Sequence, residues 1–171
     1  MRLTQGLNNF NVYLGVNPDP LSGVKSVDLP EIAHKKVDLD MAGMGGAVSM
    51  PIPGQIDSMQ LKLNASVQTI GMLRSAAPVS NEITVRAIFE QIDTGSGGRV
   101  TEARTYVCRG SCGTSGGGSL ERGSENAASL EFELFYYKVM VAGSVVTEID
   151  KFNNICIING VDYAAEVRDA I

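Results

Sequence analysis

Few residues in this chain of 171 could support catalysis. His34 is the sole histidine, so the sequence cannot supply a two-histidine metal site, and any Ser-His-Asp or Cys-His arrangement would have to use this one side chain. Because His34 stands beside Lys35 and Lys36, we interpret it as a solvated strand residue. The carboxylates lie mainly in alternating segments whose polar faces meet water, and none is selected as an acid and base pair. We therefore predict that the chain is not an enzyme.

Three cysteines complete the set of reactive side chains. Cys108 and Cys112 have a C-x3-C spacing with no further Cys or His nearby, whereas a structural zinc ion needs about four ligands. The number of cysteines is odd and their density is low, which fits a reducing compartment rather than a disulfide scaffold. We predict free thiols at all three positions, including Cys156, and no metal site.

Two glycine-rich segments superficially resemble nucleotide-binding loops. The run from Gly113 to Ser119 lacks the lysine that reaches the phosphates, because Gly118 stands at that position. The run from Gly43 to Gly46 lacks the third glycine of a dinucleotide fingerprint and lies in a strand context. A net charge of -5 and a pI near 4.9 argue against a surface that binds nucleic acid. We expect no cofactor.

The elements that carry these residues are mainly strands. Period-two alternation of apolar and polar side chains predicts half-buried strands over residues 59–67, 83–90 and 130–136. Shorter strands are predicted over 36–41 and over 24–32, where Pro30 indicates an edge or a strand end. The 19 glycines and the absence of tryptophan fit β-structure with long loops.

Helical spacing occurs twice. Apolar residues predict a short helix over 69–77, which Pro78 ends, and a closing helix over 161–171, after Asn159-Gly160. The predicted fold class is therefore mainly β, a small β-sandwich or barrel with one flanking short helix and a C-terminal helix. The length fits a single domain spanning 1–171. No apolar stretch approaches the roughly 18 residues of a membrane span, and no apolar signal segment is seen at residues 1–10, so we expect a cytoplasmic protein.

Two segments are predicted to be loops. Residues 110–125 are rich in glycine and serine and offer too little apolar surface to order themselves, so we expect a flexible loop. Residues 41–54 mix glycine with apolar side chains that a loop would expose, which predicts an extended hairpin that contacts another protein surface. The expected contact residues are Met41, Gly43, Met44, Gly45, Gly46, Val48 and Met50.

The order of motifs in the last third of the chain resembles a known family. These motifs are Phe135-Tyr136-Tyr137-Lys138, Thr147-Glu148-Ile149-Asp150, Ile158-Asn159-Gly160-Val161-Asp162 and Ala165-Glu166-Val167-Arg168. Together with Leu7-Asn8-Asn9-Phe10-Asn11-Val12-Tyr13 near the start, they make the sequence similar to the major tail tube protein family of contractile-tailed phages, which phage-tail-like bacteriocins share.

The resemblance implies a structural role. Six subunits are expected to close a ring, and rings are expected to stack into a hollow tube that DNA or protein crosses without specific binding. The expected partners are other copies of the chain, a tail sheath protein, a baseplate or tube-initiator protein and a tape-measure protein. Assembly is expected in the bacterial host cytoplasm, followed by incorporation into a virion tail or a phage-tail-like particle.

Two further sets of residues are given roles on the expectation that the chain is a tube subunit. Leu7, Phe10 and Tyr13 are expected to form a terminal interface, since a chain end orders only when something holds it. Glu90, Glu131 and Glu133 are candidates for the lumen wall, where acidic side chains would repel phosphates.

Two alternative functions stay open at this point. One is a ring protein of a secretion or bacteriocin-type injection system, which the sequence does not separate from a phage tail. The other is a monomeric β-barrel that binds a small ligand, which would need an enclosed apolar cavity.

Overall fold

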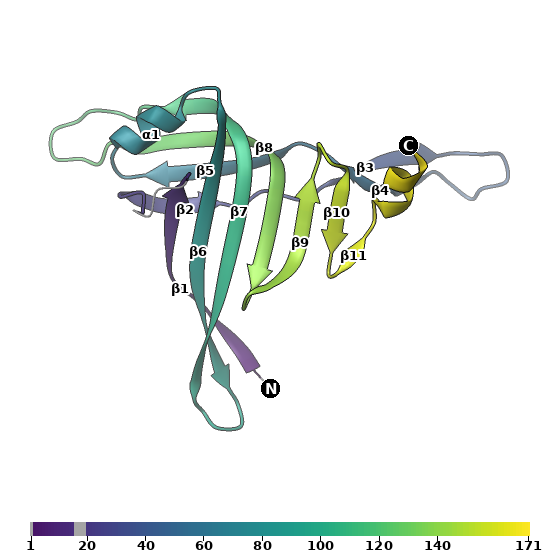
Figure 1. Ribbon diagram of the computed structural model, residues 1–171, viewed down its shortest axis with the longest axis horizontal. Coiled ribbons are helices and arrows are strands. Elements are labelled where there is room, and N and C mark those ends of the chain that lie inside the picture. The colour runs from purple at the N-terminus through teal and green to yellow at the C-terminus, as the bar shows by residue number, and fades with distance from the viewer. Residues whose placement is uncertain (1, 16–19) are drawn as a thin grey trace.

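The computed structural model describes residues 2–15 and 20–171. Figure 1 shows that this part of the chain is built almost entirely of strands, with a short helix in the middle of the sequence and another at its end. The elements are β1 (Arg2–Leu14), β2 (Val24–Asp28), β3 (His34–Leu39), β4 (Val48–Ile56), β5 (Met59–Ala65), α1 (Ile70–Ser75), β6 (Ser80–Asp93), β7 (Arg99–Gly116), β8 (Ala128–Val141), β9 (Ser144–Asp150), β10 (Ile155–Ile158), β11 (Val161–Asp162) and α2 (Ala165–Ala170).

Strand β8 is the branch point of the main antiparallel sheet. One of its edges pairs with β7, while the other edge is divided between β5, opposite residues 128–134, and β9, opposite residues 136–141. In the described residues the sheet has 9 strands, in the order β1-β6-β7-β8-β9-β10-β11, with β2 joined through β5. Because two strands share one edge of β8, the sheet curls into an open half-barrel, as Figure 1 shows.

The core lies on the inner face of this curl. Alternate residues of β5 and β8 point into it, and Phe132, Leu61 and Leu63 are completely buried. Helix α1 closes one end of the core through Met72, and Thr69 caps the helix by accepting a hydrogen bond from the backbone N–H of Met72. The alternation that the sequence shows therefore becomes the division between the core and the opposite face.

The strands predicted over 59–67, 83–90 and 130–136 are confirmed as β5 and parts of β6 and β8, and the helix over 69–77 is confirmed as α1. The mainly β fold class is confirmed as well. Strands β1, β7, β9, β10 and β11 were not predicted. Of the helices that the structure describes, neither is long and apolar enough to cross a membrane.

The predicted loop over 110–125 is wrong in its first half. Residues 110–116 belong to β7 and pair with β8. Backbone hydrogen bonds to β8 hold this segment in a strand, although its side chains are small. At Gly110 the two strands approach so closely that a Cβ would lie 2.2 Å from the backbone oxygen of Glu133. The glycines of this segment therefore permit close strand contact rather than looseness.

The closing helix is also shorter than predicted. Asn159 and Gly160 have φ values of 51° and 81°, the combination that a tight hairpin turn requires. Val161 consequently pairs with Ile158 as β11, and the helix α2 begins only at Ala165.

Asp162 fixes this C-terminal turn. Its carboxylate accepts hydrogen bonds from the backbone N–H of Ala164 (3.0 Å) and of Cys156 (3.3 Å), and from the Arg168 guanidinium (2.9 Å). Desolvation acts to raise the pKa of Asp162, but the three hydrogen bonds outweigh it, so the pKa lies below its ordinary value. The ionised carboxylate therefore stabilises the folded chain.

We predict that Phe132→Ala lowers the free energy of unfolding by about 3–5 kcal/mol, because it removes a fully buried aromatic side chain from the centre of the core. Urea denaturation followed by circular dichroism measures the change. Leu120→Ala, at a side chain that is 96% exposed, is the control and should stay within about 0.5 kcal/mol of the wild type. Equal losses for both variants would contradict the placement of the core.

We predict that Asp162→Ala destabilises the chain by about 1 kcal/mol at neutral pH, because three hydrogen bonds to a carboxylate that solvent still reaches are lost. The contribution is complete above the ordinary aspartate pKa of about 3.9 and disappears as the pH falls through the lowered pKa of the folded state. Urea denaturation at a series of pH values tests this. Asp169→Ala, an exposed carboxylate on α2, serves as the control, and a pH-independent difference for Asp162→Ala would contradict the assignment.

Candidate interaction surfaces

Strands β3 and β4 form a hairpin outside the main sheet. In the part of the chain that the structure describes they pair only with each other, with Val37 opposite Met50 and Leu39 opposite Val48. Figure 1 shows the ribbon projecting past α2 at one end of the longest axis of the molecule. Its turn, residues 40–47, uses Gly43 at a φ of 97°, a value that side chains other than glycine rarely adopt.

Apolar side chains cover the outer part of this hairpin, beyond its base at Ile56, which packs against the core. The exposed fractions of Val37, Met41, Met44, Val48 and Met50 lie between 39% and 59%. An isolated two-stranded hairpin is only marginally stable in water, and exposed apolar patches of this kind mark contact sites. The structure thus gathers the predicted contact residues on one projection, with Met41, Gly43, Met44, Gly45 and Gly46 in the turn and Val48 and Met50 on β4.

The chain exposes more surface than a folded monomer of its mass normally does. The chain exposes 10648 Å², whereas a folded monomer of 18.2 kDa is expected to expose about 8,100 Å². The excess of about 2,500 Å² is comparable to the area that stable subunit interfaces bury. The chain therefore exposes more surface than a compact monomer of its mass.

A second apolar surface opens between β1, β2 and β6. Leu7 and Phe10, which the sequence assigned to a terminal interface, lie on the core side of β1 because they pair with Phe89 and Ala87 of β6. They border a cavity of about 260 Å³ that is open to solvent, together with Val27, Leu29, Phe89 and Tyr106. We call this the β1–β2 groove. Sequence analysis missed Leu29, although the alternation in β6 correctly placed Phe89 with Val85 and Ala87.

Tyr13 does not join this groove. It pairs with Thr84 on the opposite face of the sheet, where the Arg86 guanidinium carbon lies 5.0 Å from the centre of its ring. The three residues predicted as one terminal interface are thus divided between two faces of β1.

The face of the sheet opposite the core is polar. Glu90, Glu131 and Glu133, the predicted lumen residues, all lie on it, because each sits one position away from a core residue in β6 or β8. Glu131 forms an ion pair with Lys62 at 3.1 Å, and Glu133 accepts a hydrogen bond from the Ser58 hydroxyl at 2.6 Å. All three side chains therefore point away from the core, Glu90 on β6 and the other two on the half of β8 that pairs with β5.

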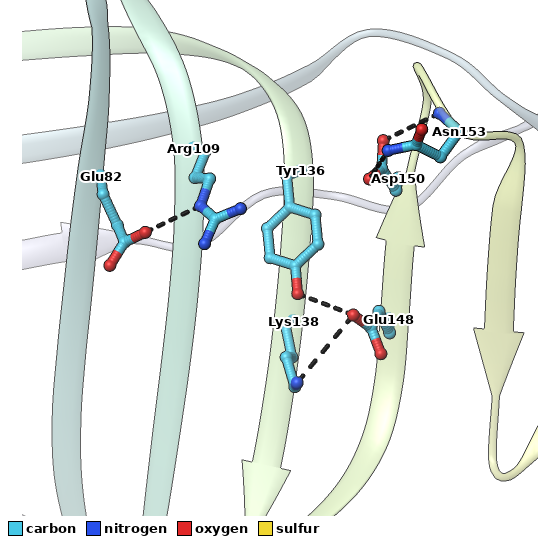
Figure 2. A network of polar contacts seen from close by, with 7 residues as sticks. All are labelled: Glu82, Arg109, Tyr136, Lys138, Glu148, Asp150 and Asn153. Carbon is cyan, nitrogen blue, oxygen red and sulfur yellow. Dashed lines mark hydrogen bonds and ion pairs between the residues drawn. The ribbon is translucent and has the colours of Figure 1, made fainter.

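A network of polar contacts crosses this face from β6 to β9, as Figure 2 shows. The Arg109 guanidinium donates to Glu82 at 2.7 Å and lies 4.8 Å from the centre of the Tyr136 ring. The Tyr136 hydroxyl donates to Glu148 at 2.7 Å, and Lys138 approaches the same carboxylate at 3.9 Å. Glu82 is opposite Arg109, Arg109 opposite Tyr136 and Lys138 opposite Glu148, while the Tyr136–Glu148 contact is diagonal, so the network links four neighbouring strands.

The chemistry available on this face is electrostatic. Burial raises the pKa of Tyr136 to about 12, with a further contribution from the hydrogen bond to Glu148, so the hydroxyl stays protonated. Burial likewise raises the pKa of the Cys108 thiol, to about 12, inside the core. The described residues contain no group of three or more His, Cys, Asp or Glu side chains placed to hold a metal ion.

Comparison with known proteins identifies the class to which this curled sheet with its projecting hairpin belongs. Residues 4–171 match the model of the phage tail tube protein FII family, to which the chain therefore belongs. It is a tail tube protein of contractile phage-type systems, a structural component of a phage tail or a phage-tail-like particle.

Individual relatives and solved structures match most of this chain. The tail tube protein of Escherichia phage P2 is 28% identical over 173 residues, which cover 98% of this chain and 97% of the relative. Among solved structures, a chain of the PVC sheath–tube complex of an extracellular contractile injection system in its extended state is 17% identical, with a TM-score of 0.48, and the match covers 77% of this chain and 86% of that one. A chain of the anti-feeding prophage baseplate, solved with 6-fold symmetry, is 14% identical, with a TM-score of 0.43 and coverage of 78% and 91%.

We predict that Glu148→Gln lowers the pKa of Tyr136 but leaves it above the ordinary tyrosine value, because burial is the larger cause of the shift. A pH titration of the tyrosine ring carbons by NMR measures the change. Asp38→Asn, on the distant hairpin, is the control and should leave the titration unaltered. An unchanged pKa in Glu148→Gln would mean that the contact does not form in solution.

Proposed function

We propose that six copies of this chain close into a ring and that rings stack into the hollow inner tube of a contractile tail. The observation that carries this proposal is the β3–β4 hairpin, whose apolar side chains project into solvent without a core of their own. Membership of the tail tube family and the excess of exposed area support it.

Ring closure would use the ends of the main sheet. Strands β1, β2 and β11 end the sheet in the described residues, apart from an isolated bridge between Tyr13 and Pro20 on β1. Free strand edges favour association with other chains. In a ring, each subunit is related to the next by the same rotation, so each covers a free edge of its neighbour until the ring closes.

Stacking would use the hairpin. A contact between two different surfaces of the same chain, repeated along an axis, never closes and so extends into a filament. The hairpin tip, residues 41–50, supplies one such surface, and methionine side chains adapt to irregular partners. Because this growth has no internal end point, another protein must set the length of the tube.

The polar face would line the lumen. Among the described residues, this face of β5 to β9 carries slightly more carboxylates than cations: Glu82, Glu90, Glu131, Glu133, Glu148 and Asp150 against Lys62, Arg86, Arg99, Arg109 and Lys138. A wall with excess negative charge repels phosphates, so DNA would pass without being held. Protein cargo would likewise meet paired, solvated charges and few apolar side chains.

The remaining partners follow from the family. The tube would lie inside a tail sheath, start on a baseplate or initiator protein and take its length from a tape-measure protein, with assembly in the cytoplasm of the bacterial host. Membership of the tail tube family supports this context.

The direct test is to image the purified chain by negative-stain electron microscopy over a range of concentrations. Annular particles with six subunits, or rods built from them, are the expected result. Particles that remain monomeric at the highest concentration would overturn the proposal, and rings of another subunit number would overturn the sixfold part of it.

We predict that Met44→Asp blocks the growth of rods while the subunit stays folded, because a charge at the exposed hairpin tip would have to be desolvated against a neighbouring ring. Sedimentation and electron microscopy measure assembly, and circular dichroism confirms the fold. Met44→Leu, which keeps the position apolar, is the matched control and should form rods like the wild type. Normal rods from Met44→Asp would count against the role of the hairpin.

A further inference from the structure

We propose that the hairpin tip of one copy seats in the β1–β2 groove of a copy in the next ring. This inference rests on the proposed function, since it names the surface that receives the hairpin. The family assignment alone does not specify this pairing of surfaces.

The groove has the shape and lining of a receptor for apolar side chains. Phe89 and Tyr106 form its floor, and the exposed side chains of Leu7 and Leu29, at 50% and 41%, stand at its rim. Its volume of about 260 Å³ exceeds the roughly 150 Å³ of an apolar cavity that admits a benzene molecule. One or more side chains of the size of methionine can therefore enter it.

The hairpin tip is the segment of this chain that best fits the groove. It carries Met41, Met44 and Met50, all exposed, and methionine fills irregular apolar spaces well. Lys25 borders the groove but is already ion-paired with Glu125, so the contact rests on burial of apolar side chains rather than on charge. Both apolar surfaces lose contact with water when they meet, which accounts for part of the excess exposed area.

The occupant must belong to another copy. Figure 1 shows the hairpin at one end of the longest axis, whereas β1 and β2 lie toward the other end, so the tip cannot fold back into its own groove. Two different surfaces at opposite ends of one chain make a head-to-tail contact, which extends through successive copies. The geometry therefore provides the repeating contact that a stack of rings needs.

The test uses two variants that each destroy one half of the contact. Leu29→Asp places a charge at the groove rim, and Met44→Asp places one on the tip; both positions are exposed, so both chains should fold. Each variant alone should stop at the particle that one layer forms. Mixed together, they should form particles of twice that mass and no longer ones, because the intact tip of the Leu29→Asp copy fits only the intact groove of the Met44→Asp copy.

Mass photometry or analytical ultracentrifugation reads the result, with Leu29→Met as the conservative control that keeps rod formation. Rods of normal length from Leu29→Asp, or a mixture that shows no doubling of mass, would overturn the groove as the receptor while leaving the tube proposal intact. A wild-type chain that forms neither rings nor rods would instead overturn the proposed function itself.

Disulfide cross-linking tests the contact between the hairpin tip and the groove rim at the level of single residues. Met44→Cys and Leu29→Cys, each made with Cys112→Ser to remove the half-buried native thiol, should cross-link to each other on mixing and oxidation, because tip and rim then meet. Cys108 and Cys156 are buried and should not react. Equal cross-linking within each single variant would contradict the pairing of tip with groove.

Discussion

The sharing of one edge of β8 between β5 and β9 is the constraint on which the rest of the structure depends. Strand β8 pairs along one side first with β5 and then with β9, and the curled sheet that these two branches form encloses a core around Phe132 and Leu61. The opposite face is left polar, and the β3–β4 hairpin is left outside the core. The same fold that buries one set of apolar side chains thus exposes another, and the exposed set is the surface proposed to contact other copies.

The structure separates stability from assembly. Core residues of β5, β6 and β8 hold the subunit together, while the hairpin tip, the groove rim at Leu7 and Leu29 and the free strand edges lie outside that core. These surfaces can therefore be matched to a neighbouring copy without weakening the fold. The polar face is independent of both, since its ion pairs run between neighbouring strands and need no partner chain. Family membership fixes the context as the tail tube, and the surfaces indicate how such a tube would be built.

Sequence analysis predicted the elements whose side chains alternate cleanly. Met59 to Ala65 shows its inner and outer faces directly, and the apolar spacing before Pro78 gave α1. It missed β7, because Gly110 to Gly116 forms a strand through backbone pairing and close approach to β8, which residue types do not reveal. The β10–β11 turn was misassigned because helical spacing after Gly160 was given more weight than the hairpin preference of Asn-Gly. Among the candidate surfaces, the hairpin was predicted from exposed methionines, whereas the groove depends on β1, β2 and β6 meeting in space.

In the proposed tube, the hairpin tip is exposed in the isolated subunit and covered in the assembly. Hydrogen–deuterium exchange followed by mass spectrometry, on the isolated subunit and on assembled particles, tests this most directly. The account predicts that peptides covering residues 41–50 exchange fast in the subunit and become protected on assembly, while peptides from β5 are protected in both. Equally fast exchange of the tip in subunit and assembly would contradict it.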